Sequence, residues 1–409
     1  MPEAVIVATA RTPIGRARKG SLVGLRADDL TATIVAAALA KVPELDGTPI
    51  DDLILGCGMP GGEQGYNLAR VVALLLGRDE LPGTTVTRYC SSSVQTTRMA
   101  MHAIRAGEGH VFISAGVETV SSFAKGTSDE LPDTRNPRFA AASARATEQA
   151  TIEVSPDSGW TDPRVLGELP DAYIAMGLTA ENVAALKGVS RAAQDEFAVR
   201  SQNLAEKATS NGFWAREITP VTRPDGTVVE LDDSPRAGTT LEGISALQPV
   251  FRPGGTVTAG NACPLNDGAA AVVIMSDTKA RELGVTPLAR IVATGVSALS
   301  PEIMGLGPVE ASQQALARAG MSIGDVDLVE INEAFAAQVI PSYLELGVDL
   351  DRLNINGGSI AVGHPFGMTG ARITTTLLNS LDWHDKTIGL ETMCVGGGQG
   401  MAMVLERLR

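Results

Sequence analysis

Two cysteines of this chain stand where a thiol could do chemistry. Cys90 follows a short β-prone stretch, residues 85–87, and opens a helix-like run that ends at Gly107. A thiol at a helix N-terminus faces free backbone N–H groups and the positive end of the helix dipole, which can lower its pKa and favour the nucleophilic thiolate. For this segment alone, an inert buried cysteine is an equally good interpretation.

Cys394 lies in a glycine-rich run, residues 394–400. Such glycines suggest a dinucleotide-binding loop, but only nine residues follow Gly400, too few for the helix and second strand of that motif. Glycines also let the backbone approach a substrate closely. We therefore expect the Cys394 thiol and the Gly396 N–H group to face a substrate, the N–H group next to a developing oxyanion.

His364 and Asn332 are the other candidates. Glycines at 357, 358, 363, 367 and 370 surround His364, a residue type suited to proton transfer near neutral pH, and this setting favours a functional role over a structural one. Asn332 and Glu333 follow a β-prone stretch, residues 326–330, at the strand end where α/β folds collect ligands. The alternative for Asn332 is a cap of the next helix.

Composition limits the class of protein. The 409 residues, 44% of them apolar, suffice for two or three domains. The N-terminus lacks a basic region and no apolar run reaches membrane-spanning length, so we expect a cytoplasmic protein. The four cysteines are far apart without metal-ligand spacing, and the net charge is −14. This pattern predicts no metal site, and no nucleic-acid or membrane partner.

A weak internal repeat suggests the elements that position these residues. Residues 6–9, 50–55, 85–90 and 111–116 resemble residues 291–294, 326–330, 353–356 and 387–392. The repeat predicts an α/β fold of two duplicated halves with mostly parallel strands. We expect residues 1–119 plus 251–284 to form the first half and 285–409 the second. Residues 120–250 are expected to form an inserted loop domain with one strong helix, capped by Ser190 and ended by Asn211-Gly212.

Taken together, four segments resemble the thiolase family, in the family's order. They are Arg-Tyr-Cys-Ser-Ser at 88–92, Asn-Glu-Ala-Phe-Ala at 332–336, Gly-His-Pro at 363–365 and Cys-Val-Gly-Gly-Gly at 394–398. The similarity extends from residues 10–15 to the C-terminus and is strongest to bacterial acetyl-CoA acetyltransferases and 3-ketoacyl-CoA thiolases. It implies a five-layer α-β-α-β-α core, a homodimer or homotetramer, and coenzyme A as a substrate with no tightly bound cofactor.

The resemblance also implies a role for each site residue. Cys90 is expected to carry the acyl group, His364 to activate the Cys90 thiol, and Cys394 to move the proton at the substrate α-carbon. Asn332 would hold a water that forms one oxyanion hole with His364, and the N–H groups of Cys90 and Gly396 would form the other. The residues expected to bind substrate are Met176, Arg236, Ala259, Cys263 and Phe335.

Two departures from the family pattern concern substrate contacts. Cys263-Pro264 replaces the usual small Ser-Gly pair beside the pantetheine arm, and Ser93 replaces a common glycine in the nucleophile helix. Both leave the acyl-chain preference open. Two rivals remain: a ketosynthase, which typically has a second His or Asn in place of Cys394, and a catalytically silent scaffold on the same fold, which would not need Cys90, His364 and Cys394.

Overall fold

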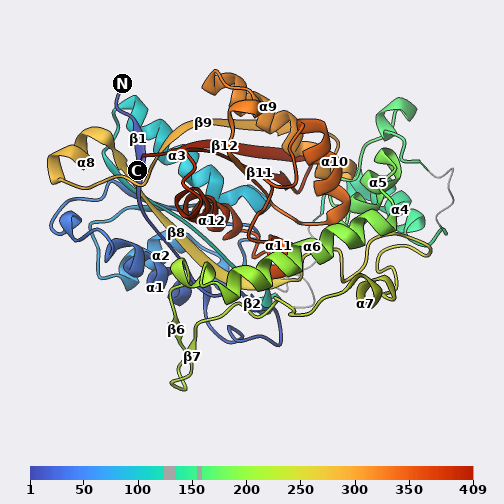
Figure 1. Ribbon diagram of the computed structural model, residues 1–409, viewed down its shortest axis with the longest axis horizontal. Helices are drawn as coiled ribbons and strands as arrows, with labels where there is room; N and C mark the ends of the chain where they lie inside the picture. Colours follow the sequence, from blue (N-terminus) through green and yellow to red (C-terminus); the bar gives the residue numbers. More distant parts are fainter. Residues whose placement is uncertain (124–134, 154–158, 409) are drawn as a thin grey trace.

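The repeated segments of the sequence become matching strands in two halves of a computed structural model (Figure 1). The structure describes residues 1–123, 135–153 and 159–408. The first half contains β1 (Ala4–Arg11), β2 (Gly15–Arg16), α1 (Ala27–Leu39), β3 (Asp52–Cys57), α2 (Leu68–Leu75), β4 (Gly83–Val86), α3 (Ser92–Ala106), β5 (Val111–Thr119), β8 (Asn266–Ser276) and α8 (Asp277–Leu283). The second half contains β9 (Ala289–Ala298), α9 (Gly307–Ala319), β10 (Leu328–Ile331), α10 (Ala336–Leu346), α11 (Ser359–Val362), α12 (Thr369–Trp383), β11 (Ile388–Val395) and β12 (Gln399–Arg407).

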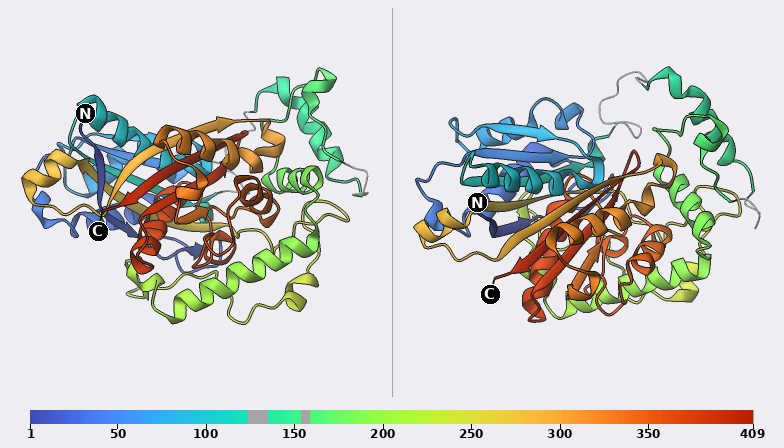
Figure 2. Two further views of the ribbon diagram at one scale, coloured as in Figure 1. Left: turned by 45° about the horizontal axis from the view of Figure 1, so that its top comes forward. Right: turned by 90° about the horizontal axis from the view of Figure 1, so that it is seen from above.

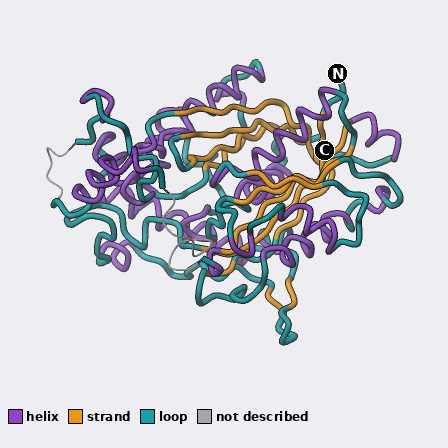
Figure 3. The backbone as a smooth tube through the Cα atoms, turned by 180° about the vertical axis from the view of Figure 1, so that it is seen from behind, coloured by secondary structure: helices purple, strands orange, loops and turns teal. Residues whose placement is uncertain are grey.

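Strand order is the same in both halves, which confirms the duplication. The first half runs β4-β3-β5-β8-β1 and the second β10-β11-β12-β9. Leu353 forms a parallel bridge with Val329 of β10, in the place that β4 takes beside β3. The two halves join where β1 pairs with β9 through Val5 with Arg290 and Ile6 with Ala289. Figure 3 shows the strands running through the middle of the molecule, with both termini at one end.

The expectation of mostly parallel strands is wrong. Among the strands of the described residues, β3–β4, β3–β5 and β10–β11 are the parallel pairs. The strands β8 and β1 in one half, and β12 and β9 in the other, pair antiparallel with their neighbours. The three residues that connect β11 to β12 are too few for the helical crossover that parallel neighbours require. Each half is therefore a mixed sheet.

Three apolar clusters define five layers. The central cluster lies between the two sets of strands and includes buried residues of α3 and α12, such as Val94 and Leu377. One outer cluster packs α1 and α2 against the first half, and the other packs α9 and α10 against the second. Figure 2 shows the N-terminal strands in blue and cyan apart from the C-terminal strands in orange and red. The α3–α12 layer places the start of both helices at one end of the core.

Residues 120–250 contain more helices than the one expected. Besides α6 (Arg191–Ser210) there are α4 (Ala140–Gln149), α5 (Met176–Lys187) and α7 (Leu241–Ser245), and a small hairpin of β6 (Val221–Thr222) and β7 (Val228–Val229) projects from the body (Figure 1). The expected bounds of α6 are confirmed, because the Ser190 hydroxyl accepts from the Ala193 N–H group at 3.1 Å and the helix ends before Asn211. None of the helices in the described parts of the chain is long and apolar enough to cross a membrane.

Candidate active site

Cys90 lies in a tight turn between β4 and α3. The 3-10 turn Tyr89–Ser91 precedes the helix, and Tyr89 adopts a left-handed φ of 44°. This sharp turn presents Cys90 at the strand end, where it is 8% exposed. The helix ends as predicted, with Gly107 at a φ of 80°.

The thiol of Cys90 is protonated in the free protein, contrary to the expectation of a lowered pKa. Burial raises the pKa of Cys90 to about 12; a hydrogen bond from the backbone N–H of Gly396 opposes the rise, and the charge of Glu118 adds to it. Desolvation outweighs the helix terminus because Cys90 sits in the turn before α3 and is almost fully enclosed. A thiolate therefore requires a base beside it.

His364 is the buried base candidate. It follows Gly363, whose φ of 113° is accessible to glycine but rarely to other residues. Its backbone N–H donates to Asn266 Oδ1 at 2.9 Å, and its Nδ1 lies 2.6 Å from Thr369 Oγ1. Burial, with a smaller effect of the Arg372 charge, lowers the pKa of His364 to about 3. The imidazole is therefore neutral at neutral pH, with one ring nitrogen unprotonated.

Asn332 faces His364 across the site. Its Nδ2 lies 3.3 Å from His364 Nε2, and its Oδ1 accepts from Ser359 Oγ at 2.6 Å. The capping interpretation is wrong, because α10 begins only at Ala336 with Phe335 at its N-cap. Asn332 is instead a fully buried side chain at the end of β10.

Cys394 and Cys263 lie in the same region as Cys90. Cys394 is the seventh residue of β11 and has no exposed surface. Burial raises its pKa well above the ordinary value, and the neighbouring thiols Cys90 and Cys263 raise it further. The backbone N–H of Cys263 donates to Ala334 O at 3.0 Å, which ties this residue to the segment after Asn332. Three of the four cysteines thus meet at one site.

The expected substrate-binding residues fall into two groups. Arg236 and Ala259 line one pocket, together with Arg16 and with Ala262 and Pro264 on either side of Cys263. Its lining contains two arginines and no carboxylate, which suits an anionic ligand.

The second group lies around Phe251. Phe335 meets the Phe251 ring edge to face with centroids 6.2 Å apart. Met176 packs with Phe251 against a small cluster of Ala146, Ile174 and Leu178. These residues therefore form an apolar wall, which meets the arginine-lined pocket where Phe335 pairs with Ala262.

Several side chains that contact the predicted site residues were not predicted from the sequence. Ser359 and Thr369 contact Asn332 and His364, and Arg372 contacts Ser359. Their spacing along the chain gives no signal, because α11, α12 and the loop between them bring them together only on folding. The sequence gives Glu333 no specific role. In the structure its carboxylate accepts hydrogen bonds from Ser201 of α6, from Asn354 and from the Ile360 N–H group, and so links three segments.

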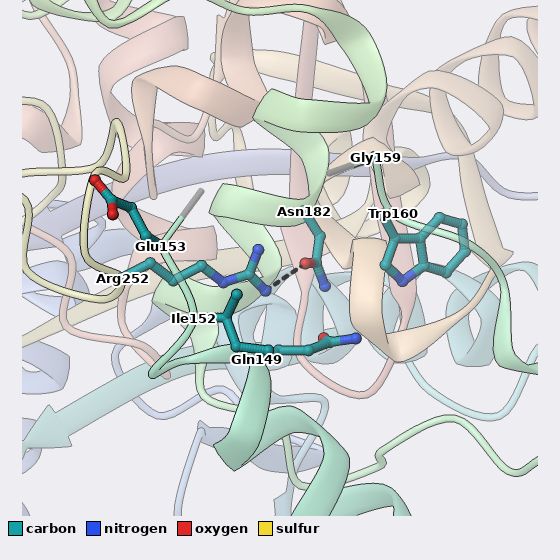
Figure 4. A pocket seen from close by; sticks show the side chains of 7 residues that line it. All are labelled: Gln149, Ile152, Glu153, Gly159, Trp160, Asn182 and Arg252. Carbon is teal, nitrogen blue, oxygen red and sulfur yellow. Dashed lines mark hydrogen bonds between the residues drawn. The ribbon is translucent and has the colours of Figure 1, made fainter. Parts of the chain in front are cut away.

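A further pocket lies between α4 and α5, lined by none of the residues predicted for the site (Figure 4). Arg252 and Asn182 point toward each other there, and an Arg252 guanidinium NH₂ group donates to Asn182 Oδ1 at 2.6 Å. Trp160 and Gln149 line the same pocket. Arg252 is the residue next to Phe251, so this pocket borders the apolar wall.

Both halves of the chain match domains of one known family. Residues 4–278 match the N-terminal domain of thiolase and residues 285–407 the C-terminal domain. The chain therefore belongs to the thiolase family.

Individual relatives cover the full length. The chain is 43% identical to the 3-ketoacyl-CoA thiolase of Aeromonas hydrophila and 43% identical to the 3-oxoadipyl-CoA/3-oxo-5,6-dehydrosuberyl-CoA thiolase of Escherichia coli, each over 100% of both chains. Among solved structures, the dimeric peroxisomal thiolase of Saccharomyces cerevisiae superposes with a TM-score of 0.87 at 32% identity, covering 99% of this chain and 97% of the other.

Proposed function

We propose that the protein cleaves 3-ketoacyl-CoA with coenzyme A through an acyl group carried on Cys90, and that it also runs the reverse condensation of acetyl-CoA. The observation that carries the proposal is the convergence of Cys90, Cys394 and the Gly396 N–H group, with a neutral His364 beside Asn332. A ketosynthase would not need the second thiol, and a silent scaffold would need none of these groups.

The reaction assigns one step to each group. His364 removes the Cys90 proton, and the sulfur attacks the 3-keto carbon of the substrate. The bond between the α-carbon and the keto carbon then breaks, its electron pair passes to the acetyl-CoA enolate, and Cys394 protonates the α-carbon. The thiol of a second coenzyme A takes the acyl group from Cys90 in a ping-pong sequence.

Two oxyanion sites support the developing charges. The N–H groups of Cys90 and Gly396 form one site, and Asn332 with a water and His364 form the other. The raised pKa of Cys90 means that the thiolate forms only as substrate and base come together, which protects the resting thiol from modification.

Coenzyme A enters as a substrate rather than as a resident cofactor. The pocket of Arg16, Arg236 and Ala259 offers positive charge to its phosphates beside Cys263. The whole chain carries a net charge of −14, so these local arginines supply the attraction. We propose a homodimer as the assembly, since the yeast relative is dimeric.

Acetyl labelling combined with thiolysis tests the proposed function. Wild-type protein incubated with acetyl-CoA should gain one acetyl group on the peptide that contains Cys90, and Cys90→Ser should gain none and lose thiolysis. Cys394→Ala should keep acetylation and the exchange of acetyl with labelled coenzyme A, because these steps need no α-carbon proton, yet lose thiolysis of acetoacetyl-CoA. An unlabelled wild type with full turnover, or parallel loss of both activities in Cys394→Ala, would contradict the assignment.

Arg252 favours a second candidate substrate, a 3-ketoacyl chain that ends in a carboxylate. The E. coli relative acts, by its name, on 3-oxoadipyl-CoA, whose acyl chain carries a terminal carboxyl group. In the described parts of the chain Arg252 has no carboxylate partner, and its buried Nε has no hydrogen-bond partner. Glu181 and Glu302 act on the Arg252 charge and Glu153 lines the same pocket, although none of the three forms an ion pair with Arg252 among the described residues. A guanidinium in this setting fits the far end of such a chain.

Comparing two six-carbon substrates decides this point. Arg252→Gln should lower kcat/KM for 3-oxoadipyl-CoA by about tenfold or more, the size of one charge-assisted hydrogen bond. For 3-ketohexanoyl-CoA, which has no terminal charge, kcat/KM should stay unchanged. Equal loss on both substrates would assign Arg252 to packing alone.

A further inference from the structure

A continuous chain of hydrogen bonds leads from a buried arginine to His364. Arg372, on α12, donates through a guanidinium NH₂ group to Ser359 Oγ at 2.5 Å, and Ser359 Oγ donates to Asn332 Oδ1 at 2.6 Å. Asn332 Nδ2 then faces His364 Nε2 at 3.3 Å. All four side chains are at most 1% exposed, so bulk solvent does not reach their polar groups.

The series of hydrogen bonds continues on the other side of the imidazole. His364 Nδ1 lies 2.6 Å from Thr369 Oγ1, and Thr369 Oγ1 donates to Pro365 O at 2.7 Å. Each hydroxyl has a single proton to donate. The direction in which one member donates therefore fixes the direction for its neighbours.

Only two orderings of the protons are self-consistent around His364. In the first, donation runs from Arg372 through Ser359 and Asn332 to His364 Nε2, and from His364 Nδ1–H to Thr369. In the second, the Asn332 amide is reversed and the Thr369 proton turns from Pro365 O, which keeps its bond from the Thr369 N–H group, to His364. Donation then runs through His364 to Asn332, and the Asn332 amide donates to Ser359.

Arg372 excludes the second ordering. A guanidinium has donors and no acceptor, so Ser359 would accept from both neighbours and its own proton would have no partner. Among the described residues Asn332 is the one acceptor for this hydroxyl. A buried unsatisfied donor costs about 1–3 kcal/mol, enough to set the direction of the whole chain.

We infer that Arg372 and Ser359 are positioning residues that fix the tautomer of His364, with the proton on Nδ1 and the lone pair on Nε2. The inference rests on the proposed function, in which this lone pair takes the Cys90 proton. The same ordering leaves the second N–H of the Asn332 amide for the proposed oxyanion water. Arg372 Nε and one of its NH₂ groups have no hydrogen-bond partner, so the bond to Ser359 is the one hydrogen bond that the buried guanidinium makes among the described residues.

Nitrogen-15 NMR of the histidine rings tests the tautomer directly. The chain has four histidines, and the signals lost in His364→Asn identify those of His364. Wild-type His364 should show a protonated Nδ1 and a bare Nε2, whereas Ser359→Ala should show a mixture of the two tautomers. Ser359→Thr, which keeps the hydroxyl, should restore the wild-type pattern. A wild-type His364 protonated on Nε2 would overturn the inference.

Kinetics supply the second readout. Ser359→Ala should lower kcat for thiolysis in proportion to the fraction of the wrong tautomer seen by NMR, with little change in KM, since only molecules with the correct tautomer turn over. Ser312→Ala is the matched control, because Ser312 of α9 is buried and its hydroxyl has no partner within the described parts of the chain. Equal kcat in the two variants would overturn the positioning role. If the wild type shows no thiolysis, the proposed function is wrong, whereas the NMR result on the His364 tautomer still holds.

Discussion

At the scale of single residues, burial rather than local sequence sets the chemistry of the site. Burial raises the pKa of Cys90 and lowers the pKa of His364 for one reason, since desolvation disfavours both the charged thiolate and the charged imidazolium. Both groups are neutral at rest. In the proposed reaction, proton transfer from Cys90 to His364 would therefore start from an uncharged pair.

The lowered pKa of His364 predicts a pH-dependent contribution to stability. The unfolded imidazole binds a proton below its ordinary pKa of 6.5, whereas the folded one does so only near 3. Between these values the unfolded state holds more protons, so the contribution is complete above pH 6.5 and is lost as pH falls toward 3. The free energy of unfolding of wild type relative to His364→Asn should therefore fall by about 1.4 kcal/mol per pH unit below pH 6.

Urea unfolding of both proteins between pH 4.5 and 7.5 measures this difference. The remaining histidines and all the carboxylates are common to the two chains, so their titration cancels. A stability difference independent of pH would mean that His364 titrates near its ordinary pKa in the folded protein.

At the scale of elements, the loop before α11 fixes the distance between α6 and the site. Gly357 has a φ of 83°, and a Cβ at this position would lie 2.7 Å from both Ala205 N and Ser201 O of α6. Ser201 in turn donates to Glu333, the neighbour of Asn332, at 2.6 Å. Because Gly357 has no side chain, α6 can pack against this loop and support the end of β10, where Asn332 lies.

Gly357→Ala should lower the free energy of unfolding by about 2–5 kcal/mol, because a left-handed conformation and a backbone clash add together. The matched control is Gly347→Ala at the end of α10, where φ is 71° and no atom lies within 4 Å of the added Cβ. It should cost about 1–2 kcal/mol from conformation alone. Similar losses in the two variants, measured by urea unfolding, would show that α6 does not approach the loop closely.

At the scale of the whole molecule, an acidic protein must attract an anionic substrate. Arg16 and Arg236 share a pocket without a carboxylate, although acidic residues outnumber basic ones in the chain, 47 against 33. Salt screens such an exposed attraction. Binding of coenzyme A should therefore weaken with ionic strength, and it should depend on these two positions rather than on the net charge.

Arg236→Gln should raise the KM for coenzyme A by about two- to fivefold, the size of one exposed ion pair, with kcat unchanged. Arg281→Gln removes the same charge from α8, where Arg281 is 70% exposed beside Asp277. This control should leave KM unchanged. An equal rise in both variants would assign the attraction to the overall field.

The sequence by itself determined which residues could react and which segments recur. Cys90 before its helix, His364 among glycines and Asn332 after a strand are local patterns, because turns, caps and strand ends are written in neighbouring residues. The duplicated strands were visible for the same reason. The four spaced segments sufficed to indicate the family.

Only the tertiary structure decided how these residues behave. The direction of the Cys90 pKa shift, the antiparallel pairing of β8 and β12 and the link from Arg372 to His364 all depend on groups far apart in the chain. Desolvation and hydrogen-bond direction are set by what surrounds a group on every side. A sequence pattern specifies neighbours along the chain and not across it, so it indicated the candidate catalytic groups without fixing their protonation.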